Sequence, residues 1–328
     1  MQFRVDRQLG FLATVNIAVL IGGGVLVGAN FLDIYNLQSM ASQVPELGLL
    51  ALGVMLAMMS GNGGIDLSGI ALANLSGVFA YIVVRDHVSA DDAPLLFSWA
   101  FAGVALLVGL AGGMLNGLLV ARAGLTPIIA TLGTQLFFTG LAVALTNGSA
   151  VSLGYVEPLD NFGNTPMLGV PQCFALFLAV ALVLGVVLRF SPFGLRLRLL
   201  GSNAKAARFA GIPEKRILFL TYTACGALAS VAGIVIAARS SSVKWDYGSS
   251  YVLIAILIAV MAGVRPEGGY GRVICVVLSA TALQMLSSLF NFMDISNFFR
   301  DLAWGVLLLA FLAQSQFDPR AWFRALRR

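Results

Sequence analysis

Apolar residues run through this chain in long blocks that short polar segments separate. A helix needs about 20 mainly apolar residues to cross the ~30 Å hydrocarbon layer of a bilayer, and runs near that length recur from one end of the chain to the other. The pattern predicts an all-α integral membrane protein with about ten transmembrane helices. The predicted spans are 10–29, 44–60, 67–84, 96–120, 127–146, 172–189, 218–238, 250–264, 273–290 and 298–316.

Composition supports this interpretation. Of the 328 residues, 59% are hydrophobic and 11% are charged, whereas an average soluble domain is about 45–50% apolar and about 25% charged. A chain this apolar cannot cover its core with polar surface. The longest polar stretches, 147–171 and 190–217, are too short to fold independently. We therefore expect residues 1–328 to form a single transmembrane domain, with 190–217 as a cytoplasmic loop.

The positions of the basic residues predict an orientation. An even number of spans places both termini on one side of the membrane. If that side is the inside, only Arg85, Arg239, Lys244 and Arg300 of the 20 Lys and Arg residues fall outside or at the outer interface. Cytoplasmic loops of membrane proteins carry such an excess of basic residues. We therefore expect cytoplasmic N- and C-termini, and the net charge of +5 reflects topology rather than nucleic-acid binding.

One predicted outer segment differs in composition from the rest of the chain. Residues 147–171 are rich in Gly, Asn and Pro and contain no Lys or Arg. The segment is either a connector or a docking surface for an extracellular partner. Composition favours the connector.

The boundary between the second and third runs is rich in glycine. Residues 60–69 read SGNGGIDLSG, with apolar sequence on both sides. Glycine lets the backbone unwind and neighbouring helices approach closely, and membranes tolerate unwound backbone only inside protein or along a wet cavity. Asp66 lies in this break, where a carboxylate is costly unless it is hydrated or paired. Two roles stay open: Asp66 and Ser68 face a translocation path or gate, or Asp66 caps the following helix.

Two further segments combine glycine with charge. Residues 193–216 read FGLRLRLLGSNAKAARFAGIPEKR, and Asn203 is an N-cap candidate for a short Ala-rich helix that ends before Gly211 and Pro213. Such a helix suits contact with a cytoplasmic motor, and the alternative is that it rests on anionic lipid. Residues 263–271, GVRPEGGYG, predict a compact turn that lacks the phosphate-loop pattern.

Few residues suit catalysis. The one histidine, His87, lies in a predicted outer loop, and the sequence has no metal-ligand cluster, nucleophile elbow or Walker motif. We therefore expect a non-enzymatic chain with no metal or cofactor of its own, so that energy comes from another polypeptide or an ion gradient. Polar residues within the predicted spans more often form interhelical hydrogen bonds than ligand contacts. Those of the fourth and fifth predicted spans include Asn116, Thr131, Thr134 and Gln135.

Several motifs together resemble the permeases of ribose-type sugar ABC importers, a family that also handles other monosaccharides and autoinducer-type furanoses. The resemblance covers most of the chain, and the order and spacing of the motifs make it specific. The motifs are GGIDLS (63–68), NGLLVARAGLTPIIATLGT (116–134), TNGSAV (146–151) and GSNAKAARFAGI (201–212).

The resemblance implies a multi-pass permease of the bacterial inner membrane. Its partners would be a second permease, two cytoplasmic ATPase subunits that bind ATP and Mg, and a periplasmic sugar-binding protein. The sugar would pass between the two permeases near the break, and 201–212 would be the coupling helix that fits an ATPase groove. The expected path or gate residues are Gly63, Gly64, Asp66, Ser68, Asn116 and Thr131. The expected coupling residues are Gly201, Ser202, Asn203, Ala207, Arg208 and Gly211.

Two motifs depart from the family pattern. Asn62 is an extra residue before GGIDLS, and Ser68 is followed directly by Gly69, where the family usually continues with Val-Gly. The turn 263–271 has one glycine where two are expected, followed by a charged insert. One hypothesis is that the chain is half of a heterodimer whose partner keeps the regular motifs. The alternative is a homodimer.

Other functions remain to be separated from this one. An ion-coupled secondary transporter would use intramembrane carboxylates and often inverted repeats. Asp66 is the one candidate, and we detect no persuasive repeat. An ABC permease for branched-chain amino acids would share the architecture, although GIDLS is not expected there. A membrane enzyme is disfavoured, because the sequence lacks His, Cys and carboxylate clusters.

Overall fold

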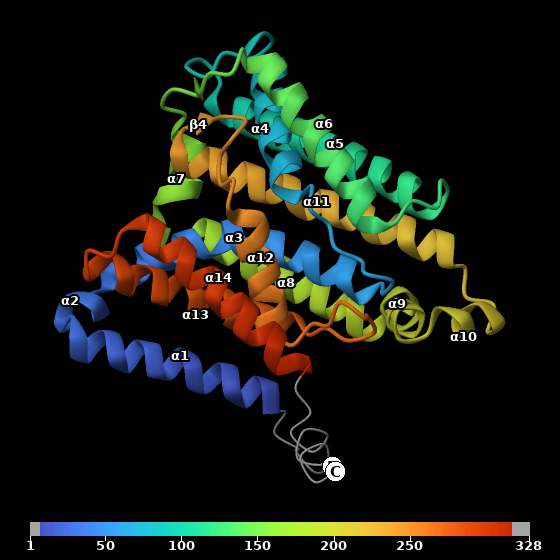
Figure 1. The fold of residues 1–328 in the computed structure, drawn as a ribbon. Coiled ribbons are helices and arrows are strands. Elements are labelled where there is room, and N and C mark those ends of the chain that lie inside the picture. The colour runs from blue at the N-terminus through green and yellow to red at the C-terminus, as the bar shows by residue number, and fades with distance from the viewer. Residues whose placement is uncertain (1–6, 317–328) are drawn as a thin grey trace.

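The computed structural model describes residues 7–316, most of which are helical (Figure 1). The longer helices are α1 (Arg7–Leu26), α3 (Ile34–Met59), α4 (Gly69–Arg85), α5 (Pro94–Ala121), α6 (Pro127–Thr146), α8 (Gln172–Phe190), α11 (Glu214–Ser240), α13 (Val273–Phe292) and α14 (Asn297–Gln316). The shorter helices are α2 (Ala29–Leu32), α7 (Glu157–Asn164), α9 (Pro192–Ser202), α10 (Ala204–Phe209) and α12 (Tyr251–Met261). The described strands are β1 (Val151–Ser152), β2 (Pro166–Met167), β3 (Val170–Pro171) and β4 (Ser242–Val243).

Seven of the described helices are long and apolar enough to cross a membrane, namely α1, α3, α5, α6, α8, α11 and α13. The apolar helices α4 and α12 are shorter. Together with α14, these helices coincide with the apolar runs of the sequence. The prediction of an all-α, multi-pass membrane protein is confirmed, and the number of helices that cross the bilayer stays a prediction.

Helices α11 and α3 lie at the centre of the packing. α11 contacts α5, α4 and α3, and α3 contacts α8, α12 and α13. In Figure 1, α4, α5 and α6 lie on one side of α11, whereas α13, α14 and α1 lie beyond α3 on the other side. Of the most apolar 18 residues of α3, 83% are buried, against 11% for α1, which packs on α13. The interior of the protein is therefore built around α3.

Small residues set the distance between α5 and α11. Gly109, Gly113 and Gly117 recur every four residues along α5 and so share one face of that helix. A methyl group on Gly113 would lie 2.6 Å from the carbonyl oxygen of Tyr222, and one on Gly226 of α11 would lie 2.2 Å from the carbonyl oxygen of Gly109. The two backbones therefore touch, as at other membrane helix interfaces that are rich in small residues.

The helix that contains the second predicted span, 44–60, begins ten residues before it, because α3 begins at Ile34. The preceding polar side chains are satisfied inside the protein. The Ser288 hydroxyl donates to Asn36 Oδ1 at 3.2 Å, and Gln284 Nε2 donates to Gln43 Oε1 at 3.1 Å. Both donors belong to α13. Tertiary contacts thus accompany the part of α3 that precedes the apolar run.

Both long connecting segments contain secondary structure. Segment 147–171 forms α7 and contributes to two antiparallel strand pairs, β1 with β4 and β2 with β3, and the choice between a connector and a docking surface stays open. α7 packs against α8 and α11. The predicted loop 190–217 likewise forms α9 and α10. These elements are short, so no long apolar periodicity marks them in the sequence.

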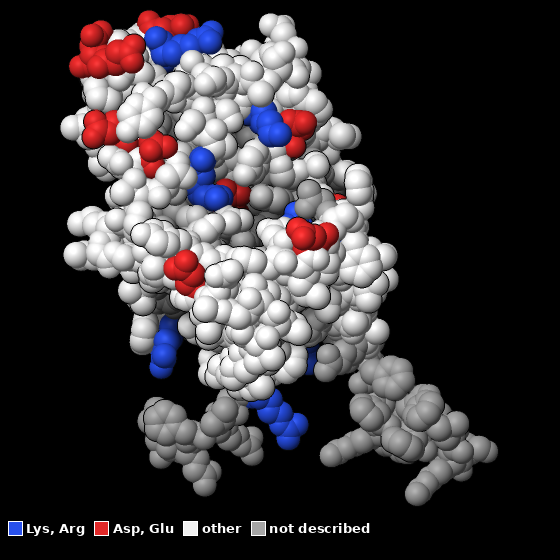
Figure 2. Space-filling model, turned by 90° about the vertical axis from the view of Figure 1, so that its left-hand side faces the viewer, with Lys and Arg blue, Asp and Glu red and all other residues white. Residues whose placement is uncertain are grey.

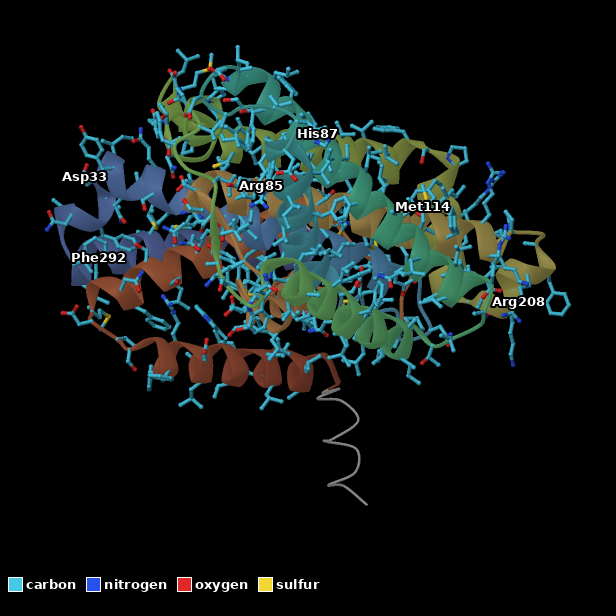
Figure 3. The ribbon with its side chains drawn as sticks, turned by 90° about the horizontal axis from the view of Figure 1, so that it is seen from above. Asp33, Arg85, His87, Met114, Arg208 and Phe292 are labelled. Atoms are coloured by element: carbon cyan, nitrogen blue, oxygen red, sulfur yellow. The ribbon has the colours of Figure 1, made fainter. Side chains whose placement is uncertain are left out.

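The two ends of the helix bundle differ in their exposed charges. α10 projects from one end (Figure 1). Figure 2 looks at the opposite end, where acidic side chains are spread over the upper part of the surface with basic ones among them. Figure 3 shows Arg208 of α10 at the first end and Asp33 at the other. Asp33 caps α3 by accepting a hydrogen bond from the backbone N–H of Tyr35 at 3.2 Å.

Candidate functional site

The glycine-rich break between α3 and α4 is unwound, as predicted. Gly61, Asn62 and Gly63 have φ values of +79°, +56° and +68°. Glycine adopts this left-handed region without steric cost, and asparagine does so more readily than most residues. A methyl group on Gly64 would lie 2.2 Å from the Ala57 carbonyl oxygen. The turn therefore folds back onto the end of α3, and Asn62, the extra residue of the motif, is part of it.

A chain of side-chain hydrogen bonds joins the break to α5 and α6. The Asp66 carboxylate accepts from the Ser68 backbone N–H at 2.9 Å and from the Ser68 hydroxyl at 2.7 Å. Asn116 Nδ2 of α5 donates to the Ser68 hydroxyl at 2.8 Å, and the Thr134 hydroxyl of α6 donates to Asn116 Oδ1 at 2.6 Å. All four side chains are buried. The expected interhelical role of the polar residues in these spans is confirmed for Asn116 and Thr134.

Thr131 of α6 satisfies the unwound backbone directly. Its hydroxyl oxygen accepts from the Leu67 backbone N–H at 3.1 Å and lies 3.1 Å from the Ile65 carbonyl oxygen and 2.8 Å from that of Pro127. Pro127 occupies the first turn of α6, as predicted, where its missing N–H is harmless. The Leu67 N–H thus finds an acceptor inside the protein, as hydrocarbon surroundings require.

The cavity beside Asp66 is small. It has a volume of about 20 Å³ and is lined by residues of α3, α4, α11 and α12, including Cys225 and Tyr251. A cavity needs about 10–15 Å³ to hold one water molecule. A water fits next to the carboxylate, but a monosaccharide does not. Within the described residues, the network around Asp66 shapes the break rather than enclosing a substrate.

We expect Asp66→Ala to destabilise the protein by about 1–3 kcal/mol, because it leaves the buried N–H of Ser68 without its acceptor. Asp66→Asn keeps a side-chain oxygen at that position, and asparagine makes the same local hydrogen bond to the backbone N–H two residues on. Its stability should therefore stay near that of the wild type. Thermal unfolding of the purified protein in detergent measures the stability of both variants. Ser68 is the N-cap residue of α4, and its own side chain makes no cap hydrogen bond. An unaltered midpoint in Asp66→Ala would contradict a structural role for the Asp66–Ser68 hydrogen bonds, whereas lost uptake in a stable Asp66→Asn variant assigns the charge to transport.

The α9–α10 segment presents the predicted coupling residues at the end of the molecule. Asn203 caps α10, as predicted, because its side chain accepts from the Ala206 backbone N–H at 3.0 Å. Ala207 is buried, and Gly211 ends the segment with a φ of +72°. The Ser202 hydroxyl donates to the Leu199 carbonyl oxygen at 3.0 Å. The α10 helix is thus a short, firmly capped projection.

Two exposed side chains define the tip of α10. Arg208 Nε donates to Glu214 Oε2 at 2.5 Å. This hydrogen bond raises the pKa of the Arg208 guanidinium above its usual value, which keeps the group charged. The neighbouring Phe209 is 95% exposed. Sequence reasoning missed Phe209, although a lone aromatic residue at the end of a basic helix is a signal for a docking contact.

Three glycine-rich segments meet at the C-terminal end of α9, in a contact we call the glycine junction. Its residues are Gly61 of the break, Gly201 of α9, and Gly268 and Gly269 of the turn 263–271. The Gly269 backbone N–H donates to the Met59 carbonyl oxygen at 3.1 Å. A methyl group on Gly201 would lie 2.0 Å from that oxygen, and one on Gly268 would lie 2.4 Å from the Gly61 Cα. The junction therefore joins the path and coupling residues through backbone contact.

A buried charge cluster lies on the other half of α3. Glu46 of α3 is 2% exposed and accepts a hydrogen bond from Arg239 of α11. The hydroxyls of Tyr247 and Tyr251 donate to its second oxygen at 3.3 and 3.1 Å. Burial, aided by the Glu46 charge, raises the pKa of Tyr247 to about 12, so the phenol remains a donor. Sequence reasoning placed Arg239 at the outer side and missed its pairing with Glu46.

Comparison with known proteins places this architecture in a family. The family model described as "Branched-chain amino acid transport system / permease component" matches residues 36–312. The chain belongs to this permease family. The permease is 32% identical over 299 residues, 90% of each chain, to the ribose import permease protein RbsC of Escherichia coli (strain K12).

Further relatives extend the match along the permease. It is 30% identical over 311 residues to RbsC of Bacillus subtilis (strain 168), covering 93% of this chain and 91% of that one. It is 28% identical over 318 residues to the L-arabinose transport system permease protein AraH of Escherichia coli (strain K12), covering 97% and 93%. No solved structure matches the permease. The resemblance drawn from the sequence motifs is confirmed.

Proposed function

We propose that the permease is the membrane-spanning subunit of an ATP-driven importer for a sugar or sugar-like small molecule. The similarity to proteins named for ribose and L-arabinose transport, over nine-tenths of the chain, carries this proposal. The family description names branched-chain amino acids. The individual relatives favour a sugar.

The proposal includes a set of partners. The permease, one transmembrane domain with ten spans and cytoplasmic termini, pairs with a second permease in the bacterial inner membrane. Two cytoplasmic ATPase subunits bind ATP and Mg and hydrolyse the nucleotide, and a periplasmic binding protein delivers the sugar. The acidic side chains spread over the end in Figure 2, opposite the projecting α10, are consistent with this orientation.

The path in this proposal runs between two permeases. The cavity beside Asp66 is too small for a sugar, so Gly63, Gly64 and Asp66 act by shaping the break, with Ser68, Asn116 and Thr131 holding it. The break then presents its surface to the pore. Selectivity therefore rests largely with the binding protein.

The coupling step uses α10. An ATPase groove receives this helix, with Arg208 and Phe209 exposed at its tip. Movement of α10 reaches α9 and then the glycine junction, where Gly201 touches the end of α3 and the 263–271 turn. Backbone contact leaves no flexible side chain to absorb the movement.

Reconstitution tests the proposed function. The permease is assembled in proteoliposomes with its ATPase and binding protein, and uptake of labelled ribose, L-arabinose and leucine is followed. We expect uptake of a sugar that requires ATP and persists when a proton ionophore is present. Uptake that needs no ATP and stops with the ionophore would indicate a secondary transporter, and uptake of leucine alone would indicate an amino-acid importer.

A charge swap tests the coupling helix. Arg208→Glu should abolish sugar-stimulated ATP hydrolysis, because it removes the exposed cation and opposes Glu214. The matched variant Arg208→Glu with Glu214→Arg restores the internal ion pair. If Arg208 contacts the ATPase, the double variant remains uncoupled. Recovery of ATP hydrolysis in the double variant would assign Arg208 a purely internal role.

A further inference from the structure

A groove of about 750 Å³ runs along the surface between α8 and α13. Both helices are candidate membrane spans. The side chains that line the groove are mainly apolar, and several are strongly exposed, such as Leu182 at 69% and Ile274 at 51%. The apolar lining comprises Leu178, Ala181, Leu182, Gly185, Val186, Leu188, Phe190, Gly271, Val273, Ile274 and Val277. The groove is therefore open at the outer surface of the helix bundle.

One end of the groove is basic. Arg189 at the end of α8, Arg198 of α9 and Arg272 at the start of α13 all line it. None of the described residues that line the groove is acidic. Across residues 7–316, Arg189 and Arg198 take part in no ion pair. Three arginines from three elements therefore line the end of the groove where α8 ends and α13 begins.

Aromatic rings support two of these guanidinium groups. Arg189 Cζ lies 5.2 Å from the centroid of the Phe190 ring, and Arg272 Cζ lies 5.7 Å from that of Tyr270. Contact with an aromatic face stabilises a cation without using its hydrogen-bond donors. The planar fork of an arginine matches the oxygen atoms of a phosphate.

The length of the groove fits one leaflet of a bilayer. From Leu178 to Phe190, α8 rises by about 18 Å at 1.5 Å per residue, and one leaflet of a hydrocarbon core is about 15 Å thick. An acyl chain can therefore lie along the apolar wall while its headgroup stays at the basic end. Basic pockets between transmembrane helices bind anionic headgroups in this way.

We propose that this groove is a binding site for an anionic phospholipid. Its phosphate is held by Arg189, Arg198 and Arg272, and one acyl chain lies between α8 and α13. The positive charge favours a net negative headgroup over a zwitterionic one, whose ammonium group would be repelled. A second protein chain seated here would bury the arginines against apolar surface, which is costly unless it supplies acidic partners.

Lipid retention in the purified transporter tests the site. The assembled complex is extracted in detergent, incubated with phosphatidylglycerol or phosphatidylcholine, and weighed by native mass spectrometry. We expect phosphatidylglycerol to bind, and Arg189→Gln with Arg272→Gln to weaken that binding at least tenfold. The matched control is Arg196→Gln with Arg265→Gln, which removes two exposed charges that do not line the groove. It should bind like the wild type.

A second variant tests the apolar part of the site. A Cβ on Gly185 would meet only Val273 Cβ, at 3.9 Å, so Gly185→Leu fills the groove without striking the backbone. We expect it to lose phosphatidylglycerol although all three arginines remain. The proposal fails if phosphatidylcholine binds equally well, if both arginine variants lose lipid alike, or if Gly185→Leu leaves lipid bound. A Gly185→Leu variant that keeps its lipid but separates the two permeases would instead identify a protein interface.

Discussion

Gly201→Ala is expected to abolish sugar uptake and to destabilise the permease by about 1–3 kcal/mol, the usual cost of forcing atoms into a packed site. The added methyl group would lie 2.0 Å from the Met59 carbonyl oxygen and 2.5 Å from the Gly269 nitrogen. Both are backbone atoms, so no side chain can rotate away. The C-terminal end of α9 must move away from α3 or from the turn 263–271. This movement removes the contact that links α10 to the glycine-rich segment 60–69.

Uptake in proteoliposomes and thermal unfolding in detergent measure the two effects. Gly140→Ala is the matched control, since Gly140 is also helical and nothing lies within 4 Å of its added methyl group. It should transport normally, because alanine favours a helix over glycine. Normal uptake and an unshifted midpoint in Gly201→Ala would show that the glycine junction is looser than these distances require.

Arg239→Gln is expected to destabilise the permease by about 3–5 kcal/mol, because it leaves the buried Glu46 carboxylate without a cation. Tyr247 and Tyr251 still donate to Glu46, but two neutral hydroxyls do not balance a charge at this depth. The double variant Glu46→Gln with Arg239→Gln removes both charges and keeps acceptors for the two phenols. This double variant should regain most of the stability that Arg239→Gln loses.

The measurement is unfolding in detergent of the wild type, both single variants and the double variant. The resulting double-mutant cycle isolates the interaction between Glu46 and Arg239. Equal destabilisation in the single and double variants would contradict the charge-pairing argument, since the cost would then come from lost packing around the long Arg239 side chain.

Much of the fold can be predicted from the sequence, because the bilayer imposes a length and a composition on each span. The glycine-rich break, the position of Pro127 and the cap at Asn203 are local features, so the residues around them predict them. The start of α3 is different. Asn36 and Gln43 look like surface residues until Ser288 and Gln284 are brought beside them.

The candidate sites likewise divide into local motifs, which the sequence predicts, and contacts between distant residues, which it does not. Gly63, Asp66 and Ser68 share one short motif and could be identified together. The pairing of Glu46 with Arg239 joins residues 193 positions apart, and single residues carry no periodic signal. The glycine junction depends on three segments whose glycines are each explained locally by a turn or a helix end. Only their mutual approach shows that they form one contact.

Helix α3 carries Glu46 in one half and the Met59 carbonyl oxygen at the glycine junction. These points are about 20 Å apart at 1.5 Å per residue. A hydrogen-bonded helix barely shortens along its axis, and almost every residue between the two points is buried against a neighbour. A push on Met59 is therefore felt at Glu46 with little loss. Helix α3 is therefore a rigid element that is fixed by an ion pair at Glu46 and by backbone contacts at the glycine junction.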